Sequence, residues 1–140
     1  MNLIDNWEGY YEYGIGYSLP QFGERVNIQV NFQGNNDNFV GTVKEVSSEH
    51  SVPLEATIIG FTDNELISFI KTYPKVARQK EFGSSEIKME NGQIGIEHQG
   101  YIDPKFDAIY GSWSITETAP ADQGAYPITV YGTWLLRRVK

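Results

Sequence analysis

Glycine followed by a large aromatic residue recurs along the whole chain. The occurrences are Gly9-Tyr10, Gly60-Phe61, Gly100-Tyr101, Gly111-Ser112-Trp113 and Gly132-Thr133-Trp134. Within a strand, glycine marks a bend or a close backbone approach, and an aromatic side chain fills the space that the bend opens. Because these pairs recur at intervals of one or two predicted strands, they indicate a sheet that curls and closes on itself. The pattern therefore favours a small β-barrel.

Alternation of apolar and polar residues locates the strands. Val26, Ile28, Val30 and Phe32 alternate with polar residues, which is typical of a half-buried strand. Similar patterns predict further strands near residues 7–17, 39–46, 54–60, 86–89, 94–101, 107–117 and 128–138. The dipeptide Asn91-Gly92 predicts a hairpin between the segments at 86–89 and 94–101, and residues 75–85 are expected to be irregular.

The segment from Thr62 to Tyr73 admits two interpretations. Thr62-Asp63-Asn64-Glu65 has the form of a helix capping box, and the apolar residues that follow have helical spacing. Alternatively, a tight turn at Asp63-Asn64 leads into a strand rich in β-branched and aromatic residues. Since short loops to the neighbouring strands suit a meander, we favour the strand. The prediction is an all-β, eight-stranded antiparallel up-and-down barrel in which residues 1–140 form a single domain.

Composition excludes several classes of function. The 140 residues include no cysteine, which excludes disulfides, thiolate metal sites and a cysteine nucleophile. The net charge of −7 argues against binding to nucleic acid, because phosphates attract basic surfaces. No signal peptide is visible, and no apolar stretch approaches the roughly 20 residues that cross a bilayer. We therefore expect a cytoplasmic protein with no membrane partner.

Residues along nearly the whole chain resemble the pattern of the calycins, the group of lipocalins, fatty-acid-binding proteins and avidins. Trp7 opens the first strand in Asn6-Trp7-Glu8-Gly9-Tyr10, and Arg137 and Arg138 lie on the last strand. The segments Gly111-Ser112-Trp113-Ser114-Ile115 and Gly132-Thr133-Trp134-Leu135 look like avidin-type strands. The resemblance implies a barrel of lipocalin/avidin-like type in which an arginine packs over the tryptophan and closes one end. Arg138 is expected in this role because it shares a face with Trp134.

The predicted inward face defines a candidate ligand site. Alternation places a mainly apolar set inside: Tyr11, Tyr13, Phe39, Val43, Leu54, Ile58, Phe69, Ile96, Ile109, Trp113 and Trp134. Glu45, Lys71, Tyr73 and His98 continue these faces as polar members. The predicted ligand-binding residues are Tyr11, Tyr13, Glu45, Phe69, Lys71, Tyr73, His98 and Trp113. If a bulge shifts the register, the polar groups lie instead at the rim or face solvent.

We expect this chain to bind a small hydrophobic or aromatic ligand in the barrel lumen, without catalysis. One alternative is a ligand-free scaffold or homo-oligomeric barrel, with Tyr110 and Tyr131 marking the contact. Another is a small isomerase or cyclase that uses Glu45 and His98 as acid and base. No cofactor or metal is expected, since the only histidines, His50 and His98, lack metal-binding spacing. The resemblance leaves haem ligation by His98 as a further alternative.

Overall fold

The computed structural model describes residues 1–46, 55–79, 87–91, 95–118 and 127–140, and every regular element in them is a strand. The strands are β1 (Asn6–Tyr13), β2 (Arg25–Gly34), β3 (Phe39–Glu45), β4 (Ala56–Asp63), β5 (Leu66–Thr72), β6 (Lys75–Gln79), β7 (Ile87–Asn91), β8 (Gly95–Asp103), β9 (Ala108–Thr118) and β10 (Pro127–Arg138).

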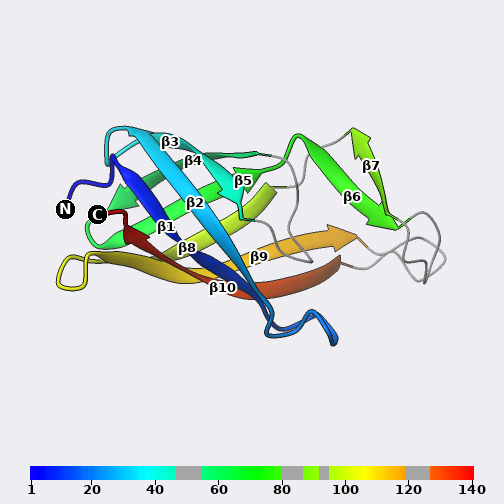
Figure 1. Ribbon diagram of the computed structural model, residues 1–140. Coiled ribbons are helices and arrows are strands. Elements are labelled where there is room, and N and C mark those ends of the chain that lie inside the picture. The colour runs from blue at the N-terminus through cyan, green and yellow to red at the C-terminus, as the bar shows by residue number, and fades with distance from the viewer. Residues whose placement is uncertain (47–54, 80–86, 92–94, 119–126) are drawn as a thin grey trace.

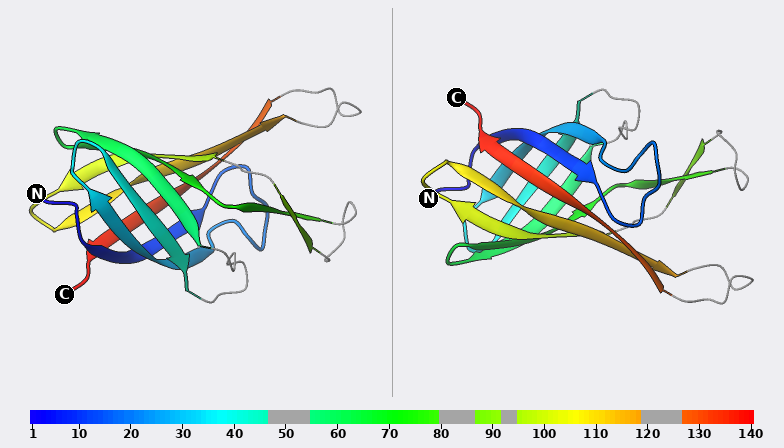
Figure 2. Two further views of the ribbon diagram at one scale, coloured as in Figure 1. Left: turned by 90° about the horizontal axis from the view of Figure 1, so that it is seen from above. Right: turned by 90° about the horizontal axis from the view of Figure 1, so that it is seen from below.

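Eight of these strands form a closed antiparallel barrel in the order β1-β2-β3-β4-β5-β8-β9-β10, and β10 pairs with β1 to complete it (Figure 1). The closing register places Trp7 opposite Arg138 and Tyr11 opposite Trp134. Both chain termini lie at one end of the barrel, and β6 and β7 project from the other end (Figure 2). This architecture confirms the predicted all-β up-and-down barrel.

The strands β6 and β7 correct two predictions. Residues 75–79 were expected to be irregular, but they form β6, which pairs with β7 in a separate two-stranded sheet. The predicted hairpin around Asn91-Gly92 is also wrong, because β7 does not pair with β8. Both edges of β8 are occupied by β5 and β9 in the closed barrel, so no edge remains for β7. Leu54 and residues 80–86 lie outside the described residues.

The segment after Thr62 is a strand, as favoured, and the helix alternative is wrong. Asp63 pairs with Leu66 across the turn, and Asn64 adopts the left-handed backbone region with φ 54°. Asparagine tolerates this conformation, which a tight hairpin turn requires. Along β5 the buried side chains alternate, so that Phe69 and Lys71 both point into the barrel.

The first strand is shorter than the alternation predicts. It ends at Tyr13, which is the last residue paired with β10, and Ile15 is 73% exposed. The chain turns here at Gly16, where φ is 104°. The turn brings Tyr17 back against Tyr13, with 4.8 Å between the ring centroids.

Inward-facing glycines make room for the aromatic side chains, as the recurring pairs suggested. A Cβ at Gly132 would lie 2.1 Å from Cε2 of Trp113 and 2.2 Å from the carbonyl oxygen of Glu12. A Cβ at Gly60 would lie 2.5 Å from the Cβ of Phe69. Only glycine fits these positions, because real Cβ atoms do not approach other heavy atoms so closely.

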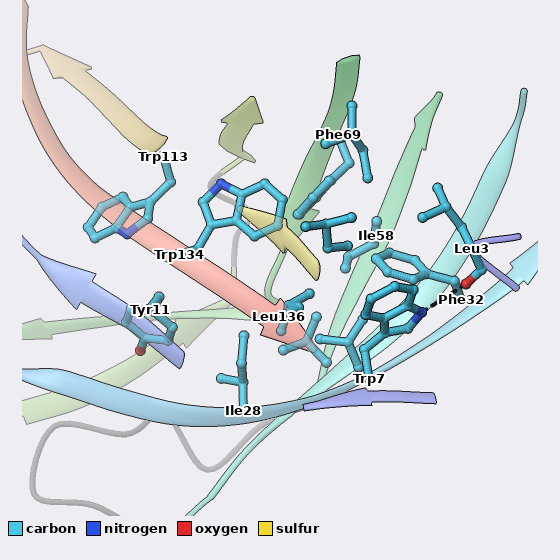
Figure 3. Packing of buried hydrophobic residues seen from close by; sticks show 14 of the residues in the cluster. Leu3, Trp7, Tyr11, Ile28, Phe32, Ile58, Phe69, Trp113, Trp134 and Leu136 are labelled. Carbon is cyan, nitrogen blue, oxygen red and sulfur yellow. Dashed lines mark hydrogen bonds between the residues drawn. The ribbon is translucent and has the colours of Figure 1, made fainter. Parts of the chain in front are cut away.

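The end of the barrel nearest the termini is filled by apolar side chains around Trp7. Its indole is fully buried, donates a hydrogen bond from Nε1 to the Leu3 carbonyl at 2.9 Å, and packs edge-on against Phe32 (Figure 3). The guanidinium of Arg138, rather than that of Arg137, lies over the indole at 4.5 Å. This end of the barrel is therefore a solid core.

Candidate functional site

Two tyrosine hydroxyls converge on one carboxylate at the opposite end of the barrel. The Tyr11 hydroxyl donates a hydrogen bond to Oε1 of Glu45, and the Tyr73 hydroxyl donates one to Oε2 at 3.0 Å. Tyr11 lies in β1, Glu45 ends β3, and Tyr73 directly follows β5. These strands run from the terminal end toward the end from which β6 projects (Figure 1). The closed sheet thus gathers three polar groups, two from the strands β1 and β3 and one from the residue that follows β5.

Burial explains why these tyrosines keep their protons. Desolvation raises the pKa of both Tyr11 and Tyr73 far above that of an ordinary tyrosine, and the nearby Glu45 carboxylate acts in the same direction. The two phenols are therefore obligatory donors, which matches a carboxylate that can only accept. We call Tyr11, Glu45 and Tyr73 the carboxylate cluster.

Lys71 lies against this cluster and is 3% exposed. Its Nζ lies 4.5 Å from the ring centroid of Tyr11 and 4.9 Å from that of Tyr73. Burial lowers the pKa of Lys71 to about 8, although the Glu45 carboxylate acts to raise it. Within the described part of the chain, its ammonium lies over aromatic faces and is attracted by the Glu45 carboxylate, but no residue there accepts a hydrogen bond from it.

His98 lies on β8 and is 5% exposed. Its ring stacks on Phe69 at 4.5 Å between centroids and is tilted against Trp134 at 5.9 Å. Burial lowers the pKa of His98 to about 3, with the Lys71 charge acting in the same direction. The ring is therefore neutral near pH 7, and Nδ1 lies 3.0 Å from the Ile96 carbonyl oxygen, which requires Nδ1 to be the protonated nitrogen.

An aromatic wall adjoins the carboxylate cluster. The rings of Tyr11, Tyr13 and Tyr17 all pack edge-on against Trp113, with centroids 6.0 to 6.1 Å from it. Trp113 is held by a hydrogen bond from Nε1 to the Thr133 carbonyl at 3.2 Å. Tyr13 and Tyr17 are only half-buried, so this wall reaches from the interior to the surface at the end of the barrel where β1 ends, which we call the mouth.

The structure brings together most of the predicted ligand-binding residues. Around the mouth it places six of them: Tyr11, Tyr13, Glu45, Lys71, Tyr73 and Trp113. The other two, Phe69 and His98, stack on each other farther inside. Trp7 lies at the filled end, away from Tyr11 and Trp113 (Figure 3). Arg138 lies over the Trp7 ring and so belongs to the same end.

The acid–base pair proposed from sequence is not assembled. The contacts of His98 are with Phe69, Trp134 and the Ile96 carbonyl, and none is with Glu45. With a pKa of about 3, His98 is also a poor base near neutral pH. The geometry therefore gives no support to an isomerase or cyclase built on these two residues.

Sequence reasoning missed Tyr17 as part of the site. The alternation predicts a first strand that runs through residue 17, whereas Tyr17 reaches the wall from the turn that follows β1. The two glycines at positions 14 and 16 were the signal that the strand ends early.

The other features of the described residues do not form a second site with buried polar groups and an aromatic wall. No group of three or more His, Asp or Glu side chains there could hold a metal ion. An open groove of about 650 Å³ lies on the outer surface, between Phe61 and Leu66 on one side and Tyr101 on the other.

No helix in the described part of the chain is long and apolar enough to span a membrane. Comparison of the chain with protein-family models, curated proteins and solved structures finds no match.

Proposed function

We propose that this protein binds a small apolar or aromatic molecule in the barrel lumen, with the polar end of the molecule at Lys71. The observation that carries the proposal is the buried ammonium of Lys71, which contacts two aromatic faces but no acceptor among the described residues. A buried cation is costly unless it is hydrogen-bonded, so a ligand oxygen placed here would supply an acceptor that the described residues do not provide.

The surroundings suggest the rest of the ligand. Trp113 and the rings of Tyr13 and Tyr17 offer flat apolar surfaces, and aromatic groups prefer the edge-on or offset contacts that such surfaces provide. Binding pockets for small molecules typically combine apolar walls with a few polar groups that orient the ligand. We further propose that the barrel is calycin-like, on the basis of the strand order and of Arg138 over Trp7.

Native mass spectrometry of the gently purified protein tests this function directly. A small molecule retained by the protein supports the proposal. Saturable binding of an apolar aromatic probe such as 2-naphthalenemethanol, followed by a change in tryptophan fluorescence, supports it as well. The variant Lys71→Met should weaken binding of this alcohol, whereas Lys44→Met should not, because the Lys44 side chain is 70% exposed on the outer surface. Absence of saturable binding across a panel of apolar alcohols would refute the proposal.

A second candidate is association between copies of the barrel. It is favoured by one observation, the outer groove, where Phe61, Leu66 and Tyr101 are each more than half exposed. Tyr110 packs against Tyr101 and is 42% exposed, and Tyr131 is 47% exposed. Sedimentation analysis of the protein and of Tyr101→Glu distinguishes the candidates, since a monomer at all concentrations excludes this one.

A further inference from the structure

We propose that Lys71 captures its ligand covalently as a reversible imine, so that the ligands of the lumen are small apolar or aromatic aldehydes. This inference rests on the proposed lumen site and specifies its ligand class. The geometric basis is an amine enclosed by the faces of Tyr11 and Tyr73, 97% removed from solvent and beside a carboxylate that two phenols hold in place.

The amine has the reactivity that the reaction needs. Only a neutral amine adds to a carbonyl, and an exposed lysine is almost entirely protonated near pH 7. Because burial lowers the pKa of Lys71 to about 8, about a tenth of its molecules are neutral near pH 7, roughly 300 times the fraction for an unperturbed lysine. Desolvated lysines of this kind are the ones that form Schiff bases in enzymes.

The reaction balances without any further reagent. The Lys71 ammonium releases one proton, and the nitrogen lone pair then forms a bond to the aldehyde carbon while the C=O π bond opens to an alkoxide. This oxygen takes up two protons, one released by the ammonium and one from the nitrogen, and it leaves as water while the C=N bond forms. The sum is an ammonium plus an aldehyde giving a protonated imine plus water, with the positive charge conserved.

The groups around Lys71 that stabilise its ammonium also stabilise the protonated imine. The iminium retains a single positive charge where the ammonium was, so the attraction to the ring faces of Tyr11 and Tyr73 persists. The Glu45 carboxylate, which already favours the charged form of Lys71, favours the iminium in the same way. Exclusion of water around a buried nitrogen also slows hydrolysis of the C=N bond.

The groups facing Lys71 are known, so the pH dependence is defined. They are the carboxylate of Glu45, the phenols of Tyr11 and Tyr73, and the imidazole of His98. Burial keeps both phenols protonated and the imidazole neutral near pH 7. Lys71 is therefore the member of this set that changes charge near pH 8, and capture should accelerate as the pH rises toward 8.

Reductive trapping tests the inference. The full-length protein is incubated near pH 7 with butanal, octanal, benzaldehyde or 2-naphthaldehyde and sodium cyanoborohydride, which reduces an iminium to a stable secondary amine. Intact mass gives the number of adducts, and peptide mapping gives their positions. At least one aldehyde should label Lys71 about tenfold or more faster than the exposed Lys44, in keeping with the larger neutral fraction at Lys71.

Variants and a competitor sharpen the result. Lys71→Arg keeps a positive charge but forms no imine under these conditions, so it should lose the fast adduct, whereas Lys44→Arg should retain it. In the wild-type protein, the alcohol 2-naphthalenemethanol should protect Lys71 from labelling by its aldehyde counterpart, a test that does not depend on how a variant folds.

The outcomes separate the inference from the function on which it rests. If the alcohol binds saturably but Lys71 is labelled no faster than Lys44 by any of the aldehydes, covalent capture is refuted and the lumen site stands. If no alcohol binds and Lys71 is not labelled, both are refuted. Fast labelling at Lys71 that the alcohol blocks supports both.

Discussion

The guanidinium carbon of Arg138 lies 4.5 Å from the ring centroid of Trp7, the residue directly opposite it in the pairing of β10 with β1. The same guanidinium donates hydrogen bonds to Asp5 at 2.9 Å, to Asp107 at 3.2 Å and to the Asn2 carbonyl at 2.6 Å. A single side chain thus joins the first strand, the last strand and the β8–β9 turn at the filled end of the barrel.

Replacing this arginine should destabilise the barrel. Arg138→Met keeps an apolar stem over the indole but removes the cation, and we expect the free energy of unfolding to fall by about 1–2 kcal/mol in urea denaturation. Arg137→Met is the matched control, since Arg137 is the exposed neighbour on the same strand. Equal losses for the two variants would contradict the role given to Arg138.

Glycine at position 132 should be indispensable. In Gly132→Ala the new methyl group would collide with the indole of Trp113 and with the Glu12 carbonyl, so we expect a loss of about 3 kcal/mol or failure to fold. Gly95→Ala is the control, because its nearest neighbour is the end of the Ile70 side chain at 3.2 Å. Thermal denaturation compares them, and similar melting temperatures would argue against a close approach at Gly132.

The buried Lys71 should make stability depend on alkaline pH. The folded protein loses this proton near pH 8 and the unfolded chain near 10.5, so between these values the unfolded state binds more protons and stability rises with pH. The variant Lys71→Met has no titratable group at this position, so its stability lacks this dependence on pH. It should be more stable than the wild type below pH 8, and this advantage should shrink by about 3 kcal/mol across the window. An advantage that is independent of pH would show that the amine is not buried in charged form.

His98 should make the stability of the protein depend on pH in the acidic range. Its pKa is about 3 in the folded protein and 6.5 ordinarily, so the unfolded state binds more protons between these values and stability falls as the pH drops below 6.5. His98→Phe keeps a ring to stack on Phe69 but does not titrate. Its stability relative to the wild type should increase by about 4–5 kcal/mol as the pH falls through this range. Parallel acid denaturation of the two proteins would contradict a buried neutral imidazole.

The barrel could be predicted because its signals are local and repeated. In β2, Val26, Ile28 and Val30 are buried and the polar residues between them are exposed, as the period of two requires. The Asn91-Gly92 turn signal failed because turn propensity concerns four residues, whereas the pairing of β8 depends on closure of the whole sheet. The preference of a short segment for a hairpin turn cannot decide the pairing when both edges of a strand already pair with other strands of the barrel.

The membership of the candidate site followed from alternation, but its internal pairing did not. Alternation predicts that Glu45, Lys71 and His98 all face the lumen. How far apart they lie along the barrel depends on the register between neighbouring strands. Glu45 pairs with Ile28 at the end of β3, and this position brings it to Tyr11 and Tyr73 rather than to His98. No residue pattern in a single strand carries that information.

The positions of the termini have a practical consequence. The backbone N–H of Val139 donates a hydrogen bond to the Asn6 carbonyl at 3.0 Å. Both chain ends lie at the same end of the barrel (Figure 2), which is the filled end, because Trp7 pairs there with Arg138. An affinity tag, a fluorophore or a surface linker attached at either terminus will therefore lie at the opposite end of the barrel from Tyr13, where β1 ends. Protein immobilised in this way can be screened against volatile and dissolved aldehydes, which tests the proposed ligand class.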